Sequence, residues 1–404
     1  MKFPKVVIDW KNLFKAVVLL LFLAILVWQT NSTEQTLETY YQTTTQLSTA
    51  QQNLSSQSAI LQEQLQITKA ALDDLKSQDQ YLINKDLEAT ISAIETTYTQ
   101  AVTTYEDLLK LKELTSKTTD EDKAFTQSLV YLSKRNYASA SATLKTLQSK
   151  ITAAKQEIIS TFTIPENVPV NNSPPGSGFS TQQVSMGGSN YLVSLVAGDL
   201  GSTRVLVDTA SDQTCGNDCP TLSLADYVSR NGAYAGINGS YFCPASYPSC
   251  AGKTNSFDTL LMNKNKVYFN SDNNVYSSVP AVIFGDGWIR FVGRSQDWGR
   301  DTGIDSMIAN QPMLVSGGQS VFGGDGDPKK GSKGPRSFVA SKGNTVYIGV
   351  VFNATVAESA LVLQTLGMEN ALNLDSGGST ALWYSGYKVG PGRNLPNAIV
   401  LARK

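Results

Sequence analysis

Residues 355–380 read TVAESALVLQTLGMENALNLDSGGST, and this stretch decides the fold class of the C-terminal part of the chain. Thr355 and Glu358 have the spacing of a capping box, so we expect a helix over residues 356–366 that stops at Gly367. The apolar run 371–374 then predicts a strand. This strand delivers Asp375 to a turn rich in glycine, where the backbone can approach a ligand closely.

Short β-type runs surround this helix and strand and outnumber the helices. We expect strands at residues 191–196, 205–207, 267–269, 279–284, 289–292, 346–352 and 398–401. One further helix is expected over residues 222–230. Many strands with few helices predict an α+β domain over residues 179–404, built on a mixed or antiparallel sheet.

The N-terminal region has a different character. Residues 16–28 read AVVLLLFLAILVW and carry no charge, so we expect a transmembrane helix over residues 16–30. Residues 1–15 contain four lysines and one aspartate, so we expect this tail in the cytoplasm and the rest of the chain outside. A cleaved signal peptide is the alternative. The absence of a small-x-small site after Trp28 favours an uncleaved anchor.

Residues 31–163 predict a helical stalk. Leucines recur every seven residues from Leu47 to Leu82 except at Thr68, although polar residues occupy many companion positions. A cleaner stripe runs from Leu87 to Leu108. A third helix begins near Thr119, breaks near residues 135–136 and resumes to about residue 162. The pattern fits a small bundle, or a coiled coil through which the chain could form a homo-oligomer. Residues 164–178, IPENVPVNNSPPGSG, predict a linker.

Composition excludes several classes of protein. The chain has no histidine, which excludes a Ser-His-Asp or Cys-His enzyme and a His-ligated zinc. A net charge of −1 argues against a nucleic-acid binder. The four cysteines, at 215, 219, 243 and 250, could form a four-thiolate zinc site, but an outward-facing domain favours two local disulfides. We expect no metal and no cofactor.

Four segments contain candidate functional side chains. Residues 236–242, GINGSYF, offer the amide of Asn238 and the ring of Tyr241, and residues 334–340 offer the guanidinium of Arg336. Residues 373–380, NLDSGGST, offer Asp375 and an anion-cradling turn made of Gly377, Gly378 and Ser379. Residues 390–397 offer Arg393. Each segment also has a purely structural interpretation. In the same order, these are an Asn-Gly hairpin turn, a surface arginine, a glycine turn and a hairpin loop.

Taken together and in this order, these segments resemble the phosphodiester glycosidase family. The resemblance covers most of residues 182–404 and none of the stalk. It implies removal of a sugar from a sugar-1-phosphodiester. The pocket that it implies consists of Asn238, Arg336, Asp375, Gly377, Gly378 and Ser379, with Glu358 and Arg393 as additions.

The chain departs from the family at two positions. Ser376 follows the aspartate where the family often has glycine, and Gly334 stands where the family often has histidine. These departures leave open a slower enzyme, another substrate, or binding without turnover. Asp325 and Asp327 are reserve acids, and Glu358 is better explained as a helix cap than as a catalyst.

With the expected anchor, the resemblance implies a membrane-anchored, extracytoplasmic glycosidase that acts on sugar-1-phosphodiesters of cell-envelope or exopolysaccharide glycans. Asp375, Arg336 and Asn238 are the candidate catalytic residues. Gly377, Gly378, Ser379, Tyr241, Arg393 and Glu358 are the candidate substrate-binding residues. Two other classes stay open: a non-catalytic binder of a glycan or phosphate polymer, and a structural envelope protein that works through its stalk.

Overall fold

The computed structural model describes residues 10–272, 278–299 and 303–404. The chain divides into two compact units, Met1–Ser92 and Ala93–Lys404. Most of the expected cytoplasmic tail, including Lys2 and Lys5, lies outside the described residues.

The first unit consists mainly of one long helix, α1 (Trp10–Ser77), whose residues are exposed from Lys11 onward. An 18-residue window of this helix has a mean hydropathy of 2.2, so by length and composition the helix could cross a membrane. A signal sequence has the same properties. Leu47 and Leu54 of the seven-residue pattern are exposed on α1, and the coiled coil stays a prediction.

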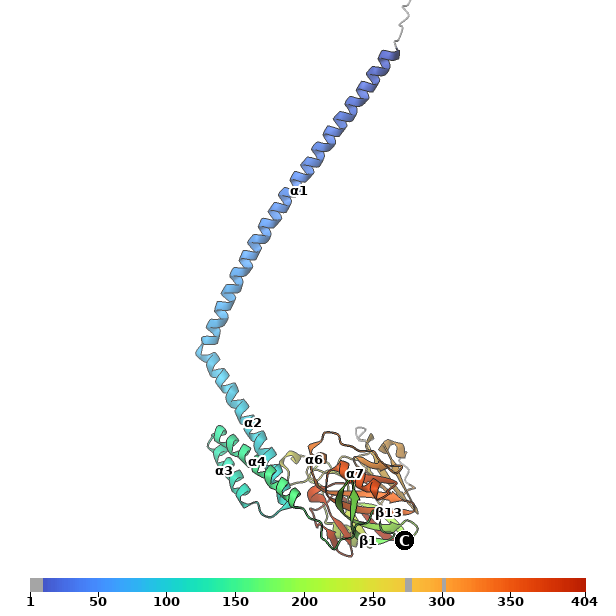
Figure 1. Ribbon diagram of the computed structural model, residues 1–404. Coiled ribbons are helices and arrows are strands. Elements are labelled where there is room, and N and C mark those ends of the chain that lie inside the picture. The colour runs from blue at the N-terminus through green and yellow to red at the C-terminus, as the bar shows by residue number, and fades with distance from the viewer. Residues whose placement is uncertain (1–9, 273–277, 300–302) are drawn as a thin grey trace, which may run out of the picture. The chain divides into compact units, whose positions relative to one another are not determined.

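Three further helices are present: α2 (Asp79–Leu114), α3 (Thr119–Ser133) and α4 (Tyr137–Thr161). From Ala93 onward they pack together around Leu108, Leu111, Leu147 and Ile151 (Figure 1). The expected break between the last two helices is confirmed. There, the side chain of Asn136 accepts a hydrogen bond from the Ser139 amide and caps α4.

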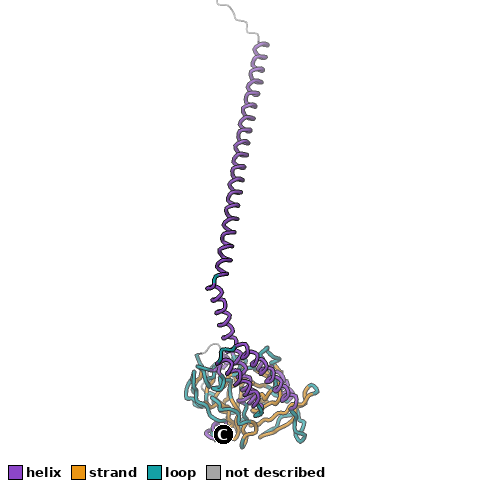
Figure 2. Tube along the Cα trace, turned by 90° about the vertical axis from the view of Figure 1, so that its left-hand side faces the viewer, coloured by secondary structure: helices purple, strands orange, loops and turns teal. Residues whose placement is uncertain are grey.

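The C-terminal domain is built on three sheets, and in the described part of the chain the strands are confined to it (Figure 2). The seven-stranded sheet has the order β1 (Gly178–Met186), β2 (Ser189–Asp199), β13 (Thr345–Ala354), β12 (Gly334–Lys342), β14 (Asn370–Asn373), β10 (Met313–Ser316), β11 (Gln319–Ser320). A five-stranded sheet has the order β16 (Tyr387–Val389), β15 (Leu382–Tyr384), β4 (Ala233–Asn238), β17 (Asn397–Arg403), β3 (Thr203–Thr209).

The third sheet has the order β6 (Tyr268–Phe269), β5 (Leu261–Met262), β9 (Ser306–Ala309), β7 (Ala281–Gly285), β8 (Trp288–Val292). Within the described residues, the paired strands of all three sheets run antiparallel. The predicted α+β class is therefore confirmed, with antiparallel rather than mixed sheets.

One hydrophobic core joins the three sheets. It contains Ile348 from the first sheet, Ile237 and Ile399 from the second, and Val282 and Ile308 from the third. Helix α5 (Leu224–Arg230) packs on the second sheet, and α7 (Val356–Thr365) packs on the first. The core fixes the sheets against one another, so the ends of β4, β12 and β14 meet at a defined place.

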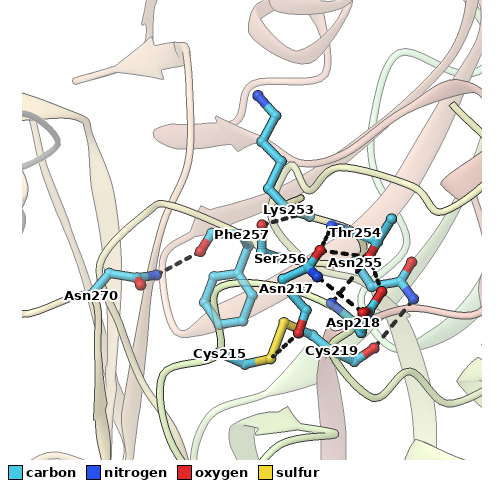
Figure 3. The surroundings of a disulfide bond; sticks show 10 residues. All are labelled: Cys215, Asn217, Asp218, Cys219, Lys253, Thr254, Asn255, Ser256, Phe257 and Asn270. Atoms are coloured by element: carbon cyan, nitrogen blue, oxygen red, sulfur yellow. Dashed lines mark hydrogen bonds between the residues drawn. A yellow bond between two sulfur atoms is a disulfide. The ribbon is translucent and has the colours of Figure 1, made fainter. Parts of the chain in front are cut away.

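Both predicted disulfides, Cys215–Cys219 and Cys243–Cys250, are confirmed, which excludes the alternative of a four-thiolate zinc site. Residues inside the first disulfide loop bond to a neighbouring segment (Figure 3). The side-chain oxygen of Asn217 accepts a hydrogen bond from the Thr254 amide at 2.9 Å. The backbone amide of Asp218 donates a hydrogen bond to the Thr254 hydroxyl at 3.1 Å. The second disulfide closes the loop that contains Tyr247.

Candidate active site

Asp375 lies where two of the sheets meet. The Leu374 amide, just after β14, donates to the Ser337 carbonyl of β12 at 2.9 Å. The Asp375 amide donates to the carbonyl of Gly239, just after β4, also at 2.9 Å. Backbone bonds to both sheets therefore fix the position from which the Asp375 side chain projects.

Burial changes the acidity of Asp375. Desolvation raises the pKa of its carboxyl from 3.8 to about 7, despite opposing hydrogen bonds from the Ser379 side chain and the Ser376 amide and the positive charge of Lys329. The Ser376 amide lies 2.8 Å from the carboxylate oxygen. At neutral pH this group populates both protonation states, which is the condition that favours general acid or base catalysis.

Asn238, at the end of β4, is fully buried and holds this corner together. Its side-chain nitrogen donates to the Asp375 carbonyl at 2.6 Å. Its side-chain oxygen accepts from the Ser337 hydroxyl at 2.9 Å and from the Ala381 amide at 3.1 Å. All these partners are protein groups, so the geometry favours a positioning role for Asn238 over direct contact with a ligand.

Arg336 is also buried, and its guanidinium bonds to backbone carbonyls. Nε donates to Ala354 at 2.9 Å, and Nη2 donates to Lys329 at 3.1 Å and to Ser332. Within the described residues, no carboxylate lies within ion-pair distance of Arg336. Burial lowers its pKa, and the side chain ties the short helix α6 (Pro328–Gly331) to β13.

Arg336→Lys is expected to loosen α6 because lysine keeps the charge but lacks the planar fork that bonds three carbonyls. We expect a loss of about 2 kcal/mol in the free energy of unfolding, and a higher KM because Lys329 is no longer held near Asp375. Urea denaturation and steady-state kinetics measure the two effects. Arg290→Lys, at an exposed arginine of β8, is the matched control. An unchanged stability for Arg336→Lys would contradict this role.

The glycine turn forms a second part of the site. Gly377 has φ +65°, a left-handed conformation that side chains rarely adopt. The Gly378 amide donates to the carboxylate of Glu113 at 2.8 Å. A Cβ at Gly378 would lie 2.3 Å from the carboxyl carbon of Glu113 and 2.4 Å from Nη2 of Arg393, so a larger residue would displace these two side chains. Ser379, the last residue of the turn, is buried, and its side chain forms a hydrogen bond with Asp375.

Arg393 lies against this turn. Its amide donates to the Gly378 carbonyl at 2.9 Å, and its guanidinium lies 5.3 Å from the ring centroid of Tyr247. The guanidinium forms an ion pair with Glu113. Thr380 follows the turn, and its hydroxyl is buried without a partner in the described part of the chain. A cavity of about 670 Å³ is lined by Glu113, Gly378, Thr380 and Arg393, and its wall also includes Lys112 and Lys333.

The remaining predicted residues lie nearby but have other partners. The Tyr241 hydroxyl accepts from the Asn373 side chain at 2.6 Å, and burial raises its pKa. Glu358 forms the predicted capping box of α7, which is confirmed. Its carboxylate also accepts from Tyr191 and pairs with Lys333 at 3.3 Å.

The reserve acids likewise have structural partners. Asp327 caps α6, and Asp325 pairs with Lys330. Elsewhere in the described ranges, no three side chains of the metal-ligating types gather into a possible metal site. The site residues that sequence reasoning missed are Glu113, Tyr247 and Thr380.

Comparison with known proteins assigns the domain. Residues 231–402 match the family described as phosphodiester glycosidase. This stretch contains Asn238, Arg336, Asp375, the glycine turn and Arg393, so the resemblance expected from the motifs is confirmed for the C-terminal domain. The family is hydrolytic, and phosphodiester glycosidase activity is the activity that this match supports. No curated protein matches the chain.

Solved structures are also similar to part of the chain. One is the catalytic domain of zebrafish N-acetylglucosamine-1-phosphodiester alpha-N-acetylglucosaminidase, auto-inhibited by its pro-peptide, with 14% identity and a TM-score of 0.44 over 59% of this chain and 87% of that chain. Another is a hypothetical protein from Synechocystis, with 12% identity and a TM-score of 0.41. That alignment covers 56% of this chain and 62% of the Synechocystis chain.

Proposed function

We propose that the C-terminal domain hydrolyses the bond between an anomeric carbon and the phosphate of a sugar-1-phosphodiester. The observation that carries this proposal is the Asp375 carboxyl, whose pKa is raised to about 7 and which accepts a hydrogen bond from a serine of the glycine turn. Asp375, which can transfer a proton, is thus bonded to the turn whose Gly378 amide can bind an anion, and this reaction requires both functions.

The proposed reaction divides the work between these two parts. The Gly378 amide and Arg393 bind the phosphate and stabilise the charge of the departing phosphomonoester. Asp375, in its ionised form, takes a proton from water as the water oxygen bonds to the anomeric carbon and the carbon–oxygen bond to phosphate breaks. The products are a free reducing sugar and a phosphomonoester. Asn238 holds the Asp375 backbone during this step.

We further propose that the domain works outside the cytoplasm, anchored by α1, on phosphate-linked glycans of the cell envelope. Two disulfides favour an oxidising compartment, and the apolar part of α1 is long enough to span a bilayer. Assembly into a homo-oligomer through the helical stalk stays a prediction.

The topology can be tested by protease treatment of intact cells or spheroplasts. We expect the protein to sediment with membranes and the protease to remove the C-terminal domain, because lysines precede the apolar segment and disulfides follow it. Lysed cells serve as the control for protease access. Full protection in intact cells, with digestion after lysis, would contradict the proposed orientation.

The activity can be tested with the full-length protein and a panel of sugar-1-phosphodiesters that differ in sugar and aglycone. The proposal predicts release of reducing sugar from at least one member. Binding of a phosphodiester without release from any member would support a non-catalytic glycan binder instead.

A further inference from the structure

Glu113 comes from the helical segment, yet its carboxylate lies on the anion donors of the glycosidase domain. One oxygen accepts from the Gly378 amide at 2.8 Å. The other accepts from the Tyr247 hydroxyl at 3.3 Å and pairs with Arg393. An amide, a hydroxyl and a guanidinium are the donors that would bind a phosphate oxygen.

The intrinsic stability of helix α2 does not favour a carboxylate at position 113. Glu113 lies in the last turn of α2, where the helix dipole disfavours a negative charge and favours a cation such as Lys112. The side chain of Glu113 is only 22% exposed and that of Arg393 only 21%, so both charges are partly desolvated. A partly desolvated carboxylate at the unfavourable end of a helix is stabilised by its contacts with the turn and Arg393.

The turn is shaped for such a group. A Cβ at position 378 would meet the carboxyl carbon of Glu113, so glycine accommodates the carboxylate where it now lies. Thr380 lines the same cavity. A tetrahedral phosphate has more acceptor oxygens than a carboxylate and can accept from several donors of the turn at once.

We infer that Glu113 is a specificity-determining residue that competes internally for the phosphate position of the substrate. A phosphodiester binds at Gly378 and Arg393 in exchange for the Glu113 carboxylate, since two anions at one guanidinium repel each other. An uncharged glycoside cannot make this exchange, so Glu113 restricts the site to anionic ligands. This inference rests on the proposed function in taking a phosphodiester as the ligand of the turn.

The test measures binding of dimethyl phosphate to the full-length protein by titration calorimetry. Glu113→Gln keeps the shape and removes the charge, and Glu113→Ala also removes the group from the turn. Both are expected to lower the Kd by roughly tenfold or more. Glu106→Gln is the matched control, because Glu106 lies on the same helix and accepts from the Ser249 amide at 3.0 Å. Its Kd should equal that of the wild type.

An unchanged or weaker affinity in both folded Glu113 variants would overturn the inference. So would a collapse of kcat in Glu113→Gln with no gain in affinity, because that result would make Glu113 part of the chemistry. Turnover is measured separately. Tighter binding without turnover by any variant would leave the inference standing and refute the glycosidase proposal, whereas turnover by the wild type without tighter binding would refute the inference alone.

Discussion

Asp375→Asn is expected to abolish most of the activity, lowering kcat for a sugar-1-phosphodiester by roughly a hundredfold or more. The substitution nearly preserves shape, and asparagine can still accept from the Ser376 amide that now bonds to the carboxylate. The fold should therefore survive while the proton-transfer group is lost. Steady-state kinetics with thermal unfolding as a control separates the two effects.

The same variant makes a distinct prediction for stability. The pKa of Asp375 in the folded protein, about 7, lies above its ordinary value of 3.8, so the folded state binds more protons than the unfolded state between these values. The stabilisation of the folded state by the protonated Asp375 carboxyl is therefore lost as pH rises from about 4 to about 7. Above pH 7, Asp375→Asn removes the buried charge and should stabilise the protein by up to about 4 kcal/mol.

The control for the pH effect is Asp212→Asn, at an exposed carboxylate. The difference in Tm between Asp375→Asn and wild type should grow from pH 4 to pH 8, and Asp212→Asn should show no such trend. Full activity in a folded Asp375→Asn variant would refute the catalytic role. A pH-independent Tm difference would refute the raised pKa.

Asn238→Ala is the second large effect that we expect. The truncation leaves the Ser337 hydroxyl, the Ala381 amide and the Asp375 carbonyl without their partner in a buried corner. We expect a loss of about 3 kcal/mol in the free energy of unfolding. Activity should fall as well, because the Asp375 backbone is no longer held. Urea denaturation at a pH of maximal stability measures the first effect.

A matched control exists on the surface. Asn344 is exposed and its side chain donates to Asp199 at 3.1 Å, so Asn344→Ala should change stability by less than about 0.5 kcal/mol. Equal stability of the Asn238→Ala and Asn344→Ala variants would contradict the positioning role of Asn238. If Asn238→Ala fails to fold, the stability prediction is met in its extreme form.

Much of the fold could be predicted because local signals agree with the tertiary structure. Each strand expected from an apolar run overlaps an observed strand, as residues 346–352 do with β13. The capping box at Thr355 and the break before Tyr137 also follow from local chemistry. Strand β1 was missed because it is polar, with Gln182 and Gln183 in its centre, and forms through pairing with β2.

The site was predictable in part. Asp375 and the glycine turn have a motif, and the structure brings them together with Arg393. The partners of Arg336 could not be inferred, because a guanidinium before a strand suits an anion and a backbone carbonyl equally well. The sequence around Glu113 contains no motif that indicates a role in the site. Its contacts with Gly378 and Arg393 join residues more than 260 positions apart.

We propose that the domain cleaves the bond between the anomeric carbon and oxygen. Hydrolysis of an active sugar-1-phosphodiester in ¹⁸O-labelled water, followed by mass spectrometry of both products, identifies the bond that breaks. We expect the label to enter the reducing sugar and the phosphomonoester to stay unlabelled. Label in the phosphomonoester would mean attack at phosphorus and would contradict cleavage at the anomeric carbon.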